Sequence, residues 1–208
     1  MSFAEIRKRS LKVATQLKFT LPSTLPLLDE SLRLRQLGDI EDRVLVLSAV
    51  VAASYGFPRD RIVSWLEREA LVSVLSGAEQ SFLRGTGVAA QQFQVQVEAL
   101  SAFAWALGFL PSMDFGKPSP SHLVSIFPDF KVAESSARFR SRAKLRDQID
   151  IVIACDLAYC LHWAINQAVV DKKAPPGKVP PHVVIERRRA LEWMLSSSEW
   201  DDVSSLDT

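Results

Sequence analysis

The chain has 208 residues, of which 48% are hydrophobic and 24% are charged, a composition typical of one globular domain and not of a disordered chain. Its 25 Lys and Arg residues against 24 Asp and Glu residues leave a net charge of +1, so no global positive field favours nucleic acid as a partner. No apolar signal segment is evident in residues 1–19, so we expect a cytoplasmic protein.

Residues 2–17 have the pattern of an amphipathic helix, with Phe3, Ile6 and Val13 among its apolar positions and basic residues elsewhere. A basic helix of this kind can bind a membrane surface or nucleic acid. We interpret it instead as an ordinary first helix with a solvated basic face. Residues 20–27 contain two prolines and are predicted to form an extended linker.

The middle of the chain predicts several further helices. Asp39 has the character of an N-cap, and the helix after it should end near Gly56. A second helix is predicted over residues 58–75. Ser76 and Glu79 then form a capping-box pattern that starts a short helix.

Residues 91–107 are predicted to form a long apolar helix, because their apolar positions repeat at a spacing of 4-3-4-3. This pattern can also serve a coiled-coil partner, but it lasts only two heptads and other faces are apolar too. We therefore assign it to the core. Residues 111–120 are predicted to be a loop, followed by a short helix near residues 122–127.

The longest predicted helix covers about residues 142–171 and contains neither Gly nor Pro. Its apolar residues fall on every side, which is typical of a helix surrounded by other helices. It is long enough to cross a membrane, but Asp156 and His162 lie within it and make a membrane span unfavourable. We predict an all-α, single-domain bundle over residues 1–208, in which this central helix packs against the helix at 91–107.

The end of the chain predicts one more helix. Residues 173–181 are rich in proline and should form a stiff linker, with Pro181 where the helix begins. The helix itself is predicted over residues 183–195. The acidic tail beyond it cannot form a core, and we expect Trp200 to hold it in place.

A group of polar residues interrupts the apolar surface of the central helix. Asp156, Tyr159, His162 and Trp163 follow one another at spacings of three or four along one side. Since a buried carboxylate requires a cationic partner, we predict that an arginine of the last helix pairs with Asp156. The expected network is structural and consists of Asp156, Tyr159, His162, Trp163, Glu186, Arg187 and Arg188.

The same residues allow a catalytic alternative. If Asp156, Tyr159 and His162 face an open cleft, they can supply the acid, donor and base of a small hydrolase. His122, His162 and His182 do not have the spacing of a metal site, and no phosphate-binding loop is present, so neither a metal nor a cofactor is expected. Cys155 and Cys160 cannot pair within one intact helix, and Cys160 has no identified base, so buried reduced thiols are predicted.

Nearly the whole chain resembles a known family, and its C-terminal third is the specific part. The motifs that carry the resemblance are Asp156-x-x-Tyr159-x-x-His162-Trp163-Ala164, Glu186-Arg187-x-x-Ala190-Leu191-x-Trp193, and Trp200-Asp201-Asp202-Val203 with the terminal Asp207-Thr208. They are similar to a bacterial family known only as a domain of unknown function. Leu206 departs from the small polar residue usual before the last pair. The resemblance implies an all-helical domain without an established activity, so it assigns no catalytic residue.

These observations favour a non-enzymatic cytosolic protein-binding domain, and an immunity protein that neutralises a bacterial toxin is the specific form that we consider. The expected partner is a protein and not nucleic acid. The alternative is the hydrolase that uses Asp156 and His162. An open cleft at His162 would favour the enzyme, and a sealed polar column would favour the binding protein.

Overall fold

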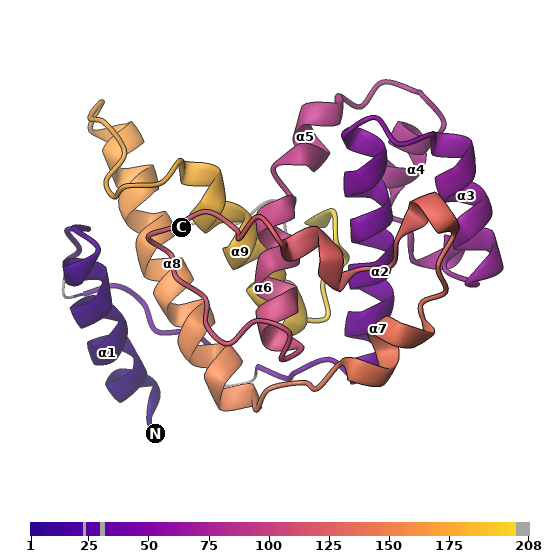
Figure 1. The fold of residues 1–208 in the computed structure, drawn as a ribbon. Helices are drawn as coiled ribbons and strands as arrows, with labels where there is room; N and C mark the ends of the chain where they lie inside the picture. Colours follow the sequence, from indigo (N-terminus) through magenta and orange to yellow (C-terminus); the bar gives the residue numbers. More distant parts are fainter. Residues whose placement is uncertain (23, 30–31, 203–208) are drawn as a thin grey trace.

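The computed structural model describes residues 1–22, 24–29 and 32–202, and every regular element in these ranges is a helix (Figure 1). The prediction of an all-α fold is confirmed. The α-helices are α1 (Phe3–Gln16), α2 (Leu37–Ser54), α3 (Arg59–Arg68), α4 (Gly77–Leu83), α5 (Ala90–Gln94), α6 (Val97–Ala106), α7 (Ala137–Arg142), α8 (Gln148–Val170) and α9 (Pro181–Met194). The 3₁₀ turns are η1 (Val72–Val74), η2 (Leu123–Ile126) and η3 (Phe130–Val132).

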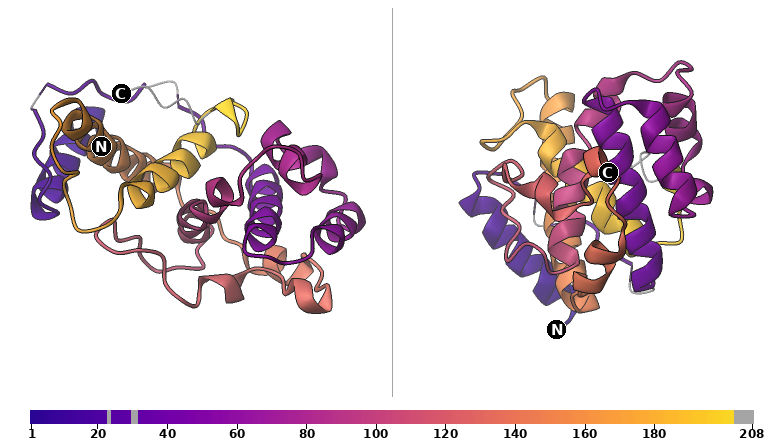
Figure 2. Two further views of the ribbon diagram at one scale, coloured as in Figure 1. Left: turned by 90° about the horizontal axis from the view of Figure 1, so that it is seen from above. Right: turned by 45° about the vertical axis from the view of Figure 1, so that its right-hand side comes forward.

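The helix α9 joins the two sides of the molecule. It packs extensively against both α6 and α8, while α1 covers another side of α8 and α2 packs against α6 (Figures 1 and 2). Both α3 and α4 lie beyond α2, at the end opposite α1. We expected the two long apolar segments to pack directly on each other, but α9 forms the main contacts with each of them.

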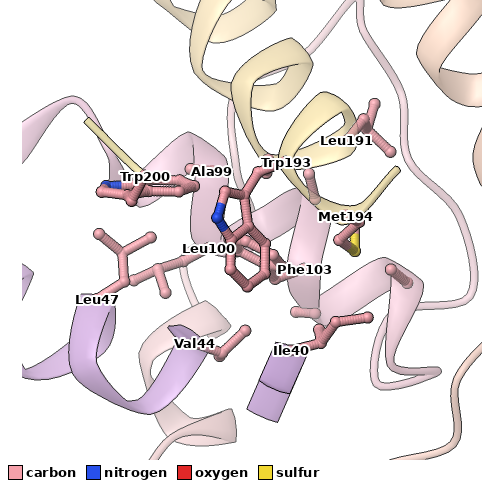
Figure 3. Close-up of a cluster of buried hydrophobic side chains, with 14 of the residues drawn as sticks. Ile40, Val44, Leu47, Ala99, Leu100, Phe103, Leu191, Trp193, Met194 and Trp200 are labelled. Carbon is pink, nitrogen blue, oxygen red and sulfur yellow. The ribbon is translucent and has the colours of Figure 1, made fainter. Parts of the chain in front are cut away.

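The core lies where α2, α6 and α9 meet (Figure 3). From Val44 to Ser54 every residue of α2 except Ala52 is buried, which explains why this part of the sequence is apolar on all sides. Trp200 is buried too, and its ring lies 5.9 Å from Phe103 and 6.1 Å from Trp193 between ring centroids. Trp200 is therefore held in the core, whereas residues 203–208 of the tail that it was expected to anchor lie outside the described residues.

Both long predicted helices are interrupted. The segment at 91–107 divides into α5 and α6, and the segment at 142–171 is helical only from Gln148, after α7 has ended at Arg142. Residues 143–147 instead run beside the end of α6. There the amide of Lys144 donates to the carbonyl of Leu107, and that of Arg146 donates to Ala106, both at 2.9 Å. These tertiary hydrogen bonds replace the helical ones that the sequence pattern predicted.

The helix ends agree with the sequence in part. The Ser76–Glu79 capping box is present, with the Glu79 amide 3.3 Å from Ser76 Oγ and the Ser76 amide 2.9 Å from Glu79 Oε2. Pro181 begins α9 as predicted. Asp39 is not an N-cap, because α2 begins two residues earlier, but its charge lies in the first turn, where the helix dipole favours it.

The predicted linkers contain almost no regular structure. The described residues of 20–27 are irregular, as are residues 111–120 and 173–180. By length and composition alone, α8 is long and apolar enough to cross a membrane. However, 61% of its most apolar window is buried against the rest of the structure, as in the core helix of a globular protein.

Candidate functional site

Asp156 lies on α8 and faces α1, where Arg7 surrounds its carboxylate. Only 1% of Asp156 is exposed. Arg7 Nε lies 3.1 Å from both Oδ1 and Oδ2 of Asp156, and Arg7 Nη2 lies 2.6 Å from Oδ1. Arg7 Nη1 donates to the carbonyl of Leu25 at 2.9 Å. Burial lowers the pKa of Arg7, but its hydrogen bonds to Asp156 and the nearby negative charges outweigh this effect and raise it.

The predicted partner of Asp156 was therefore wrong, although a buried pair with an arginine was expected. We expected Arg187 or Arg188 from α9, but the cation comes from the first helix. In the structure Arg7, Ser10 and Ala14 lie at helical spacing on α1 and all three are buried. The apolar stripe of α1 thus includes Arg7, which we had assigned to the solvated basic face.

The next turns of α8 meet α9. Arg188 Nη1 lies 2.8 Å from Nδ1 of His162, and Arg188 Nε donates to Glu192 Oε1 at 2.6 Å. A guanidinium has no acceptor, so His162 Nδ1 must accept this hydrogen bond and the ring is neutral. Burial, together with the charge of Arg188, lowers the pKa of His162 to about 4.

Tyr159 lies between the two arginines. Its ring centroid is 5.3 Å from the guanidinium carbon of Arg7 and 5.0 Å from that of Arg188. Burial raises the pKa of the phenol. Asp156, Tyr159 and His162 therefore do share one side of α8, as predicted, but each is engaged by a cation from a neighbouring helix. Trp163, beside them, is half-buried and packs against the apolar core.

These contacts leave Asp156 and His162 poorly suited to act as a catalytic acid and base. Both oxygens of Asp156 are occupied by Arg7, and only 6% of His162 is exposed. The ring nitrogen Nδ1 is occupied by Arg188. A general base needs a free lone pair within reach of the substrate, and His162 offers neither access nor a free Nδ1.

The other predicted members of the network lie on different faces of α9. Arg187 contacts Glu98 of α6, with Nε and Nη2 at 3.0 and 2.6 Å from Glu98 Oε2. It also donates to the carbonyls of Asp114 and Lys117, and Glu98 Oε1 accepts from the amide of Ser119. This cluster ties the loop at 111–120 to the core.

Glu186 does not join the cluster around Asp156. Its Oε2 lies 3.8 Å from Arg189 Nη1 and accepts no hydrogen bond from the described residues. Burial raises the pKa of Glu186 to about 7, while the charge of Arg189 opposes the increase. Arg189 itself donates to the carbonyl of Trp200 at 3.0 Å, so this arginine secures the end of the described chain.

Metal and thiol chemistry receive no support from the described geometry. Among residues 1–22, 24–29 and 32–202, no group of three His, Cys, Asp or Glu side chains is placed to hold a metal ion. Cys155 and Cys160 are both buried and unpaired with each other. Burial raises the pKa of Cys160 to about 12, which disfavours a nucleophilic thiolate.

A groove of about 810 Å³ lies elsewhere on the surface, between α2, α6 and residues 119–131. We call it the α2–α6 groove. This volume lies within the range of ligand-binding pockets. Its walls are mostly apolar and are formed by Val51, Ala52, Phe57, Val97, Leu100, Leu123, Phe127 and Phe130.

The rim of the α2–α6 groove exposes large apolar side chains. Tyr55 is 65% exposed and Val124 is 70% exposed, and both line the groove. Val132 is also exposed and directly follows the lining residue Lys131. The sequence did not predict this site, because it is assembled from three separate segments (48–57, 97–100 and 119–131) that do not form one amphipathic stripe.

Comparison with protein families identifies the chain. The model of a family described as a domain of unknown function, DUF4272, matches residues 7–203. The chain belongs to the DUF4272 family. Comparisons with curated proteins and with solved structures give no match.

The structure places two of the motifs that suggested this family side by side in the DUF4272 chain. Asp156, Tyr159 and His162 lie on α8, whereas Glu186 and Arg187 lie on α9, which packs against it. Arg188 links the two motif segments, because it contacts His162 Nδ1 and its guanidinium lies over the ring of Tyr159. In the DUF4272 chain these motifs therefore maintain the packing of helices around α8.

Proposed function

We propose that this DUF4272 protein is a non-enzymatic cytosolic protein-binding domain that receives its partner in the α2–α6 groove. The observation that carries the proposal is the combination of a large apolar groove with an exposed apolar rim at Tyr55 and Val124. Exposed apolar clusters of this kind are typical of interaction sites, because a monomer gains nothing from leaving them in water. Aromatic side chains such as Tyr55 are also enriched among the residues that dominate binding energy.

The state of the polar residues on α8 supports binding over catalysis. Asp156 is neutralised by Arg7, and His162 is buried against Arg188 with a pKa of about 4. Neither residue lines the α2–α6 groove. The alternative, a small hydrolase that uses Asp156 and His162, would require the Arg7–Asp156 ion pair and the Arg188–His162 hydrogen bond to open before a substrate could enter.

The partner class that we propose is a secreted bacterial toxin, which would make this protein an immunity protein. An immunity protein needs a stable surface and no chemistry of its own. The sealed polar column and the exposed groove meet these two requirements. Candidate toxins are the products of genes adjacent to the one that encodes this chain.

The test compares two valine substitutions of equal chemistry. Val124 lies in the groove and is 70% exposed, whereas Val170 lies at the end of α8, away from the groove, and is 74% exposed. Val124→Asp should weaken binding of the purified partner by about tenfold or more, because it places a charge in an apolar contact. Val170→Asp should bind like the wild type.

The result that contradicts the proposal is equally specific. Equal affinity of the wild type and Val124→Asp for the partner would remove the groove from the interface. Turnover of a hydrolase substrate that is lost in His162→Ala, while the variant stays folded, would favour the enzymatic alternative.

A further inference from the structure

A second, smaller cavity lies on the opposite side of the molecule from α3 and α4. It has a volume of about 230 Å³ and is bounded by α1, α8, the end of α6 and the loop after it. We call it the α1–α8 cavity. Trp105, Phe115 and Leu157 supply part of its apolar wall, and Arg9, Ser10 and Asp150 supply polar groups. Its volume is below that of pockets for drug-sized ligands, so it suits a molecule of metabolite size.

The two charged residues of the α1–α8 cavity differ from their neighbours on the same helices. Arg7 and Asp156 form a buried ion pair between α1 and α8. Arg9 and Asp150 are exposed on the same two helices, and neither side chain has a hydrogen bond or ion pair within the described part of the chain. The cavity therefore carries one unpaired cation and one unpaired anion on its wall.

Ser10 adds an independent observation. Only 2% of this residue is exposed, and its hydroxyl has no hydrogen-bond partner among the described residues. A buried hydroxyl without a partner destabilises a protein, and such groups are normally satisfied by protein, water or a bound molecule. Ser10 lines the α1–α8 cavity, and a rotation of its side chain toward the cavity would let a polar ligand there supply the missing partner.

We propose that the α1–α8 cavity binds a free α-amino acid with an apolar side chain. Arg9 would bind the carboxylate, since a guanidinium matches a carboxylate with two parallel hydrogen bonds. Asp150 would accept from the ammonium group, and the Ser10 hydroxyl would donate to the carboxylate. The side chain of the ligand would pack against Trp105, Phe115 and Leu157.

The opposite charges of Arg9 and Asp150 select for this class. An amine alone would leave Arg9 unpaired, and a carboxylic acid alone would leave Asp150 unpaired. A zwitterion satisfies both residues at once, and the apolar wall favours an aliphatic or aromatic side chain over a polar one.

Isothermal titration of the full chain with L-leucine, L-methionine and L-phenylalanine tests the proposal. At least one of the three should bind. 4-Methylpentanoate, which lacks the ammonium group of leucine, and 3-methylbutylamine, which lacks its carboxylate, should bind about tenfold or more weakly than leucine. Arg9→Gln and Asp150→Asn should each weaken amino-acid binding by a similar factor.

Matched controls come from α1 and from the residue that precedes α8. Lys8→Gln and Asp147→Asn change exposed charges that do not line the α1–α8 cavity, and they should leave the affinity unchanged. Thermal melting of all four variants checks that each is folded. The proposal is overturned if none of the three amino acids binds up to about 10 mM, or if Arg9→Gln and Asp150→Asn bind like the wild type. Val124→Asp should not affect this site, so the outcome is independent of the α2–α6 groove.

Discussion

Removal of the Asp156 carboxylate is the strongest perturbation that the structure predicts. Asp156→Ala leaves the guanidinium of Arg7 buried without its counterion, while the hydrogen bond from Arg7 to Leu25 remains. Breaking a buried ion pair from one side costs about 3–5 kcal/mol of unfolding free energy. In a chain of this size each kcal/mol lowers the melting temperature by about 2–4 °C. We therefore expect Asp156→Ala to melt about 6–20 °C below the wild type.

The assay is thermal unfolding followed by circular dichroism, with urea denaturation as a second measure. Asp150→Ala is the matched control, because Asp150 lies on the same helix but is exposed and should cost less than about 1 kcal/mol. In a double-mutant cycle, the loss in Arg7→Ala/Asp156→Ala should be smaller than the sum of the two single losses. If Asp156→Ala melts at or above the wild-type temperature, the structural role of the pair is refuted and the hydrolase alternative gains support.

Further predictions concern pH, thiol reactivity and helix content. The pKa of His162 is lowered in the folded state, so its contribution to stability should be present above pH 6.5 and be lost as the pH falls towards about 4. The pKa of Glu186 is raised, so its contribution should be present below pH 4.5 and be lost as the pH rises through about 7. Urea unfolding between pH 4 and 8 measures the free energy of unfolding at each pH, and the pH dependence contributed by each residue should be absent from its variant, His162→Gln or Glu186→Gln. A variant whose unfolding free energy changes with pH in parallel with that of the wild type would contradict the assignment for that residue. Cys155 and Cys160 should react with a thiol reagent only after unfolding, because both are buried and their pKa values are raised; rapid labelling of the native protein would contradict this burial. Far-UV circular dichroism should show a helical spectrum with little strand, and a strand-dominated spectrum would refute the architecture.

Local signals in the sequence were sufficient for the class of fold. The capping box at Ser76 and Glu79 and the proline at the start of α9 act through neighbours three or four residues away, so a sequence pattern contains them completely. The burial of Asp156 was also predictable, because apolar residues surround it on every side of α8.

Features that depend on distant segments could not be read in the same way. The sequence has no Gly or Pro at the end of α7 that would predict a break. The break at residues 143–147 is instead accompanied by hydrogen bonds to the carbonyls of Ala106 and Leu107, which are distant in the sequence. The choice of Arg7 over Arg188 as the partner of Asp156 depends on α1 covering α8, and a helical wheel cannot rank arginines from different helices. The α2–α6 groove includes Ser119, whose amide donates to Glu98, and Glu98 is in turn bound by Arg187 from the distant α9.

Hydrogen exchange of the complex tests the proposed binding function most directly. With the partner bound, amides of residues 119–131 and of the last turn of α2 should exchange more slowly, because these segments line the α2–α6 groove. Amides around His162 should keep the exchange rates of the free protein. Protection confined to the segment around His162, with unchanged exchange in residues 119–131, would contradict binding in the groove.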